Sequence, residues 1–264
     1  PEDLLNAGFD EYYGQYHIFH DWKNAKEFND YVISNLDLSH KLPAGKSVIG
    51  SFLTHDDSSS MIHGGENFCK LTTFLQATLP MCNPYFIDGF QTGDYYTRKY
   101  ADKYSPETRT DKHEMTVHYG KLDLFNLSRK PGGKEESLRP FIQESHALRD
   151  KYSDIVGPKG TFIVLDKEGD KNDQIITFAR HYQGKTLLVV ANKNVNRPVA
   201  CKIKVPTLSK NQKLVNLLPS YGKESIFQAA DGELRVDVGP SRVHVFEIDT
   251  PNIEKNTNKV YRQR

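Results

Sequence analysis

The stretch from Lys46 to Asp94, KSVIGSFLTHDDSSSMIHGGENFCKLTTFLQATLPMCNPYFIDGFQTGD, decides the fold of this chain. It opens with a short apolar run, Ser47–Leu53, which is typical of a strand buried on both faces. Helical spacing of apolar residues follows over 62–79, and Tyr85–Ile87 predicts another strand before a glycine turn. The polar pair His55-Asp56 stands where the first apolar run stops. Because loops that follow the strands form the functional face of strand–helix repeats, this pair is a candidate site.

Further strand–helix units flank this stretch. Phe9–Gly14 predicts a short strand, and residues 24–36 carry apolar side chains on one helical face, with Asn24 as the N-cap. After a long polar loop, residues 91–129, a third helix is predicted over residues 135–152. Three units cannot close an eight-stranded barrel, and a free three-stranded parallel sheet would expose its edges. We therefore expect additional chain to complete the sheet.

The pattern changes near Gly157-Pro158, where short β-rich runs separated by turn residues begin. These runs are Phe162–Leu165, Ile175–Arg180, Thr186–Ala191, Val199–Val205, Lys213–Leu217, Leu234–Val238 and Val243–Ile248. Repeated short strands with turn signals predict an antiparallel β-sandwich. We expect three segments: a barrel portion over 1–156, a β-sandwich over 157–249, and a polar, frayed tail over 250–264.

Composition indicates a soluble globular protein and excludes several classes. The 264 residues are 37% hydrophobic and 26% charged, with a net charge of +1. This balance gives no reason to expect binding to nucleic acid or to a membrane, and no apolar run is long enough to span one. The three cysteines are too few for a disulfide framework, so buried free thiols are expected. The start shows no signal peptide, but it also lacks Met, so the compartment, cytoplasmic or secreted, stays open.

The ordered features resemble the last third of the barrel, and the β domain, of the α-amylase family of glycoside hydrolases. Thr54-His55-Asp56 resembles the family's fourth motif, an apolar strand ending in Asn-His-Asp, with Thr54 in the place of Asn. Pro80–Pro84 is similar to the Pro-Gly-x-Pro entry to the last strand, with Asn83 in the place of Gly. Tyr85–Gly93 resembles that strand and its Gly-x-Glu-x-Gly turn, with Gln91 in the acidic position. The resemblance covers about residues 1–248.

The resemblance implies a retaining glycoside hydrolase or transglycosylase that acts on α-glucans. Asp56 would be the third catalytic carboxylate, which stabilises the transition state, and His55 would bind the same sugar. The nucleophile Asp and the acid/base Glu lie on earlier strands in the family, so this fragment alone is expected to be inactive. Asp57, Asp94, Tyr95 and Arg98 are candidates for further contacts to the sugar chain.

The expected partners are an α-glucan or oligosaccharide, together with either a missing N-terminal barrel segment or a second copy of the chain. No cofactor is expected in this segment, although a calcium site in the full-length protein would draw its ligands from upstream. His63 and Glu66 share a helical face, but a pair without a third ligand is more typical of a solvated helix than of a metal site.

Two other interpretations stay open. In the first, the chain is a degenerate amylase-like protein that binds glycans or acts as a scaffold without catalysis, which the departures at Thr54, Asn83 and Gln91 favour. In the second, His55, Asp56 and Asp57 belong to an unrelated α/β module and only cap the helix that follows.

Overall fold

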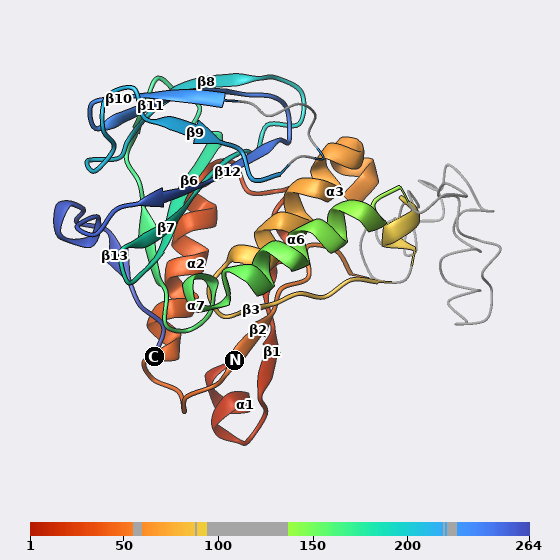
Figure 1. Cartoon of the computed structure of the whole chain (residues 1–264). Helices are drawn as coiled ribbons and strands as arrows, with labels where there is room; N and C mark the ends of the chain where they lie inside the picture. The colour runs from red at the N-terminus through yellow and green to blue at the C-terminus, as the bar shows by residue number, and fades with distance from the viewer. Residues whose placement is uncertain (55–59, 88, 94–136, 219, 221–225) are drawn as a thin grey trace.

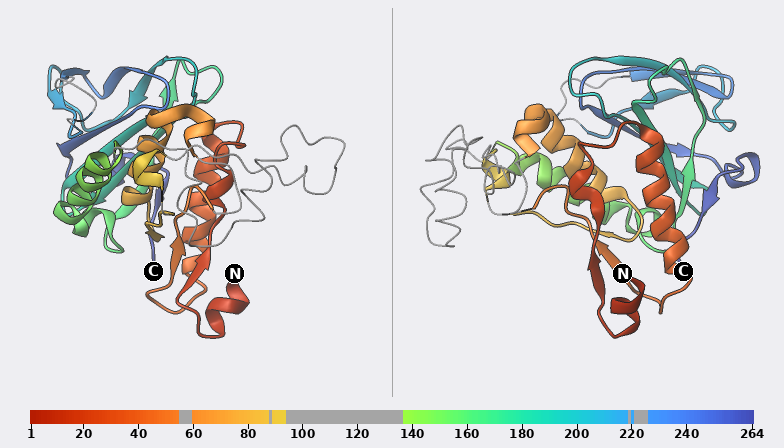
Figure 2. Two further views of the ribbon diagram at one scale, coloured as in Figure 1. Left: turned by 90° about the vertical axis from the view of Figure 1, so that its right-hand side faces the viewer. Right: turned by 180° about the vertical axis from the view of Figure 1, so that it is seen from behind.

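The computed structural model describes residues 1–54, 60–87, 89–93, 137–218, 220 and 226–264. Within them, the chain forms a three-stranded parallel sheet and two five-stranded antiparallel sheets. Helices pack beside the parallel sheet, and the antiparallel sheets form a second part of the molecule (Figure 1). Both termini lie at the same end of the molecule (Figures 1 and 2).

The parallel sheet has one covered face. After the short helix α1 (Glu2–Asn6), its strands are, in order, β1 (Glu11–Tyr13), β2 (Ser47–Ile49) and β3 (Cys82–Asn83). The register aligns Tyr12, Val48 and Cys82, whose side chains are all buried. On the opposite face, Tyr13 is 46% exposed, and Asn83 is also exposed. Parallel sheets are normally covered on both faces, so this sheet has room for a further layer.

Two predictions about these strands are corrected. The strand predicted over Ser47–Leu53 ends at Ile49, because the chain turns and the Ser51 hydroxyl bonds to the carbonyl of Leu53. The strand predicted at Tyr85–Ile87 is wrong, since the third strand of the ladder is β3. Pro84 follows β3 directly and has no N–H to continue the ladder.

Two long helices cover the buried face of the sheet. α2 (Ala25–Ser39) begins as predicted, with the Asn24 side chain accepting a hydrogen bond from the Glu27 N–H at 3.0 Å. The Tyr12 hydroxyl of β1 donates to the Asn35 side chain of α2, which joins strand and helix. α3 (Ser60–Thr78) confirms the second predicted helix, although its backbone is non-helical at Gly64 and Gly65.

The third predicted helix is confirmed as α6 (Arg139–Lys151), followed by the short α7 (Ser153–Val156). Arg149 of α6 donates to the carbonyls of Ala77 and Cys82, at 2.8 and 3.2 Å. These bonds fasten α6 to the end of α3 and to β3.

The antiparallel sandwich is confirmed. One sheet has the order β5-β8-β11-β10-β9, and the other β12-β7-β6-β4-β13. Their bounds are β4 (Thr161–Val164), β5 (Lys167–Glu168), β6 (Ile175–Tyr182), β7 (Lys185–Asn192), β8 (Val199–Lys204), β9 (Lys213–Val215), β10 (Ile226–Ala230), β11 (Glu233–Val238), β12 (Val243–Asp249) and β13 (Val260–Tyr261).

The sheet that contains β6 and β7 is covered on both sides. Phe178 and Val189 belong to the apolar cluster shared with the helices, whereas Ala179 and Val190 belong to the cluster between the two sheets. Alternate residues of a strand point to opposite faces, so these neighbours pack into different cores. Figure 2 shows this layer from two further sides.

The frayed end predicted for residues 250–264 is wrong. Ile253 is fully buried, a short 3-10 helix, η7 (Glu254–Asn256), follows, and β13 pairs antiparallel with β4. Arg264 bonds to the carbonyl of Leu42 at 3.1 Å. A polar sequence can therefore be ordered, because its backbone completes a sheet and its few apolar residues fill the core.

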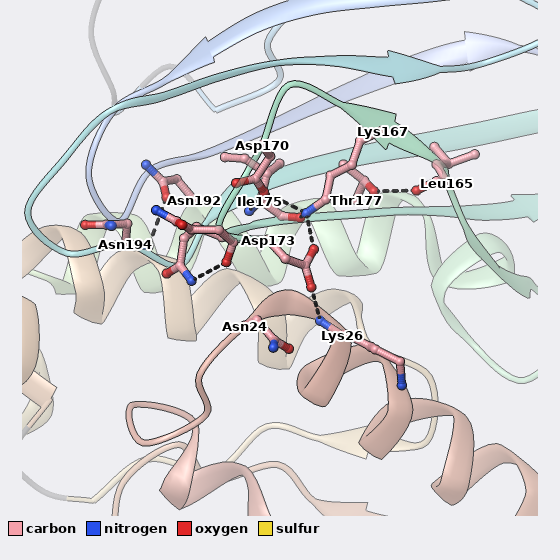
Figure 3. Close-up of polar contacts among 12 residues, drawn as sticks. Asn24, Lys26, Leu165, Lys167, Asp170, Asp173, Ile175, Thr177, Asn192 and Asn194 are labelled. Atoms are coloured by element: carbon pink, nitrogen blue, oxygen red, sulfur yellow. Dashed lines mark hydrogen bonds and ion pairs between the residues drawn. The ribbon is translucent and has the colours of Figure 1, made fainter.

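Two sets of polar contacts, one around the partly buried Lys167 and one around the buried Arg180, join the β part to the helices. Lys167 lies 2.8 Å from the carboxylate of Asp170 and 2.7 Å from that of Asp173, and Asp173 contacts the first turn of α2 (Figure 3). Arg180, with no exposed surface, donates to the carbonyls of Thr78, Thr161, Gly157 and Gly160.

Candidate functional site

The three parallel strands bring the segments that follow them to one edge of the sheet. The 3-10 helix η1 (Gln15–Ile18) follows β1, residues 50–54 follow β2, and residues 84–87 lead from β3 to η2 (Phe90–Thr92). This is the edge where the predicted site belongs.

All six predicted site residues lie outside the described part of the chain. His55, Asp56 and Asp57 fall between Thr54 and Ser60, and Asp94, Tyr95 and Arg98 follow Gly93. Their roles stay predictions. What the structure describes is the scaffold on which the chain enters and leaves these segments.

An apolar cluster holds both ends of the segment that contains His55 and Asp56. Leu53 before the segment and Met61 after it belong to this cluster, together with Phe90 and Leu138. Thr54 and Ser60 are themselves buried. The described residues on either side of the predicted site are therefore held in place by packing.

Aromatic rings pack together at the same edge of the sheet. Tyr16 stacks on Phe52 with ring centroids 5.0 Å apart, and Phe19 meets Phe52 edge-on at 5.2 Å. Burial raises the pKa of Tyr16 well above its ordinary value, so its hydroxyl stays protonated. These rings link the segment after β1 to the segment after β2.

Gly50, directly after β2, allows the strands to approach closely. A side chain at Gly50 would overlap the Sγ atom of Cys82 on the neighbouring strand. Burial raises the pKa of the Cys82 thiol to about 12, so the sulfur stays a protonated, packed group. Cys69 and Cys201 are also buried and free, as predicted.

The start of α3 is held by contacts that the sequence did not reveal. The ring of His63 stacks on that of His20, with centroids 3.7 Å apart. A Cβ at Gly64 would lie 2.7 Å from Cβ of Phe68 and 2.9 Å from Cγ1 of Val195. Val195 comes from the β part, which thus contacts the helix just after the predicted site. The Gly64-Gly65 pair inside a helical pattern was the available signal for this break.

Lys193 brings a cation close to this region. It is 8% exposed, and its Nζ lies 5.2 Å from the ring centroid of Phe19. Burial lowers its pKa, while the nearby carboxylates of Glu27 and Asp21 oppose that shift. The contact with the Phe19 ring is of the cation–π type.

Among the described residues, no three His, Cys, Asp or Glu side chains come together to hold a metal ion. The carboxylates of Asp170 and Asp173 are both paired with Lys167. No helix in the described part is long and apolar enough to cross a membrane.

Comparison with solved structures identifies the fold. The chain matches an Anoxybacillus α-amylase with a TM-score of 0.65 and 12% identity, covering 95% of this chain and 50% of that one. It matches a maltogenic α-amylase from Thermotoga neapolitana with a TM-score of 0.63 and 13% identity, covering 94% and 53%. An α-amylase from H. orenii gives a TM-score of 0.62 at 16% identity, covering 93% and 51%.

These matches establish that nearly the whole chain has the fold of an α-amylase-type structure. The chain spans about half the length of the solved proteins that it matches, which is consistent with a C-terminal portion. No protein-family model matches the sequence, and no curated protein sequence matches it either.

Proposed function

We propose that this chain is the C-terminal portion of a retaining glycoside hydrolase or transglycosylase that acts on α-glucans. The supporting observation is the shared fold over about 94% of the chain and half of each α-amylase that it matches. In this proposal β1, β2 and β3 are the last strands of a (β/α)8 barrel over residues 1–156, and the β-sandwich begins at residue 157.

Asp56 and His55 carry the chemistry assigned to this portion. A carboxylate in the segment that follows β2 would hold sugar hydroxyls and stabilise the positive charge that develops on the sugar ring. The nucleophile and the acid/base would come from strands that precede this portion. Asp57, Asp94, Tyr95 and Arg98 would contact neighbouring sugars.

The uncovered face of the parallel sheet supports the proposal that another segment or a second copy of the chain packs against it. Tyr13 on this face is 46% exposed, and three further apolar side chains just before or after the strands in the sequence are exposed: Leu4 at 53%, Phe9 at 59% and Tyr85 at 43%. We propose that an upstream barrel segment covers them, and that the 264-residue chain alone associates with itself instead. Light scattering coupled to size-exclusion chromatography tests this: a monomer at all concentrations would contradict self-association.

The decisive experiment extends the parent reading frame upstream of Pro1 and assays the longer protein on maltooligosaccharides. Cleavage is expected, and Asp56→Asn should reduce kcat by at least about a hundredfold, whereas Asp37→Asn on the exposed surface of α2 should not change it. The 264-residue chain alone should be inactive. Activity in the isolated chain, or full activity in Asp56→Asn, would contradict the proposal.

A non-catalytic, glycan-binding relative is the second candidate. The side chain of Gln91, which stands where the family has an acid, accepts a hydrogen bond from the Gly89 N–H at 3.1 Å and so serves the turn itself. If the upstream frame lacks an Asp and a Glu at its strand ends, this second function replaces the first.

A further inference from the structure

A pocket of about 310 Å³ lies where α6 and α7 meet the β6–β7 hairpin and β12. Its volume is at the lower end of small-molecule sites, which span about 300–1,000 Å³. The lining residues that matter chemically are Lys151, Tyr152, Asp154, Tyr182, Lys185 and Glu247.

The pocket is separate from the candidate catalytic edge. α6 starts next to that edge, because the Leu138 N–H donates to the Gln91 carbonyl at 3.1 Å. The helix then runs from Arg139 to Lys151, a length of about 20 Å at 1.5 Å per residue, and ends at the pocket.

One side of the pocket is a row of hydrogen-bonding groups. The Tyr152 hydroxyl donates to Oε2 of Glu247, and Lys185 Nζ lies 4.0 Å from Oε1 of the same carboxylate. Burial and the bond to Glu247 raise the pKa of Tyr152, so it remains a donor. The Glu247 side chain is 34% exposed, which leaves its carboxylate able to accept further hydrogen bonds.

Tyr182 adds an aromatic surface from the β6–β7 hairpin. Its side chain is half-buried, and Lys159 Nζ lies 5.9 Å from its ring centroid. Lys159 is itself paired with Asp154 at 2.9 Å. A flat apolar ring beside convergent polar groups is the usual composition of a small-molecule site.

The charges select the ligand. Two lysines, Lys151 and Lys185, and two carboxylates, Asp154 and Glu247, line the pocket, and Asp154 is also paired with Lys159 beside it. An anionic ligand would be repelled by the two carboxylates, and a cationic ligand by the two lysines. An apolar ligand would remove water from these four charged groups without offering hydrogen bonds in return. A neutral ring that carries many hydroxyls satisfies both the donors and the acceptors and can lie against Tyr182.

We propose that this pocket is a second, non-catalytic binding site for a sugar ring. The choice of glucose as that sugar rests on the proposed function; the pocket's preference for a neutral polyol does not. The site would hold an α-glucan chain on the protein at a distance from the bond being cleaved.

The test is titration of the 264-residue chain with maltotriose. Calorimetry measures the affinity, and amide chemical shifts in ¹⁵N-labelled protein locate the bound sugar. Maltotriose should shift the amides of Gln183 and Lys185. Tyr182→Ala and Glu247→Gln should each weaken binding at least tenfold. Tyr261→Ala removes a similarly half-buried tyrosine from β13 and should leave binding unchanged.

Equal affinity in wild type and in both pocket variants, or no binding by the folded wild-type chain, would overturn the proposal. So would loss of binding in Asp56→Ala, since the sugar would then occupy the catalytic edge. Circular dichroism checks that each variant folds. The hydrolase assay on the longer protein is scored separately, so failure of the proposed function is distinguishable from failure of this site.

Discussion

The carboxylate of Asp173 accepts a hydrogen bond from the backbone N–H of Lys26 at 2.9 Å, and its carbonyl accepts one from Ala25 at 2.6 Å. A residue of the β part thereby caps the first turn of α2, as Figure 3 shows. The free N–H groups of a helix terminus favour a negative charge. The β part therefore fixes where α2 begins.

Asp173→Asn should lower the free energy of unfolding by about 1–2 kcal/mol. Asn keeps the shape and tolerates the positive φ of this position, so the loss reports the charge that faces α2 and Lys167. Urea denaturation measures it. Asp154→Asn breaks an exposed ion pair with Lys159 and should leave stability nearly unchanged, because water screens such pairs. Equal effects of the two variants would contradict the capping role.

Arg180→Met should lower the free energy of unfolding by about 3 kcal/mol or more, because several buried carbonyls lose their donor together. Burial lowers the pKa of Arg180 to about 9, so it remains charged at neutral pH and its bonds are charge-assisted. The matched control is Arg235→Met on the exposed surface of β11. Thermal unfolding that is unaffected by Arg180→Met would show that the carbonyls find other donors.

Acid should destabilise the β-sandwich through His244. Burial, with a smaller effect of Arg242, lowers its pKa to about 4, against about 6.5 in an unfolded chain. Between these values the unfolded state binds more protons, so stability falls as pH is lowered from about 6.5 to 4, by up to about 3 kcal/mol. His244→Gln should lose most of this dependence in unfolding measured at pH 7 and pH 4. If the wild type and His244→Gln lose the same free energy of unfolding between pH 7 and pH 4, this role of His244 is contradicted.

Gly64→Ala should reduce kcat of the longer, active protein by about tenfold or more, since small displacements near a site cost large factors in rate. Its new Cβ would collide with Phe68 and Val195 and displace the first part of α3, which follows the predicted site in the sequence. Steady-state kinetics measure the effect. Adding Val195→Ala should restore part of the rate, because it removes the Cγ1 contact, whereas Val215→Ala, at an exposed valine, should restore none. A change in KM alone would contradict a positioning effect.

Periodicity and cap residues predicted the helices well. Asn24 caps α2 because its side chain, its position and the apolar stripe behind it agree. The predicted β-rich runs correspond to β4, β6, β7, β8, β9, β11 and β12, each of which lies between turn residues, whereas β5 and β10 were not predicted. β13 was missed because its two residues, Val260 and Tyr261, carry no pattern, and only pairing with β4 makes them a strand.

The candidate site was predictable only through local motif resemblance. Contacts between residues far apart in sequence, such as His20 with His63 or Gly64 with Val195, depend on how the β part packs against the helices. Neither charge nor spacing within one segment specifies them. The third strand was misplaced for a similar reason, because Tyr85–Ile87 has higher β propensity than β3 but follows the proline that ends the ladder.

The sheet of β6 and β7 lies between two hydrophobic cores, with Phe178 packed in one core and Ala179 in the other. A chain cut after Val156 would leave the helices without the surface that covers them. The sandwich alone would turn the Phe178 side to water. We therefore expect the parts on either side of residue 157 to unfold together, and calorimetry of the chain should record one cooperative transition rather than two.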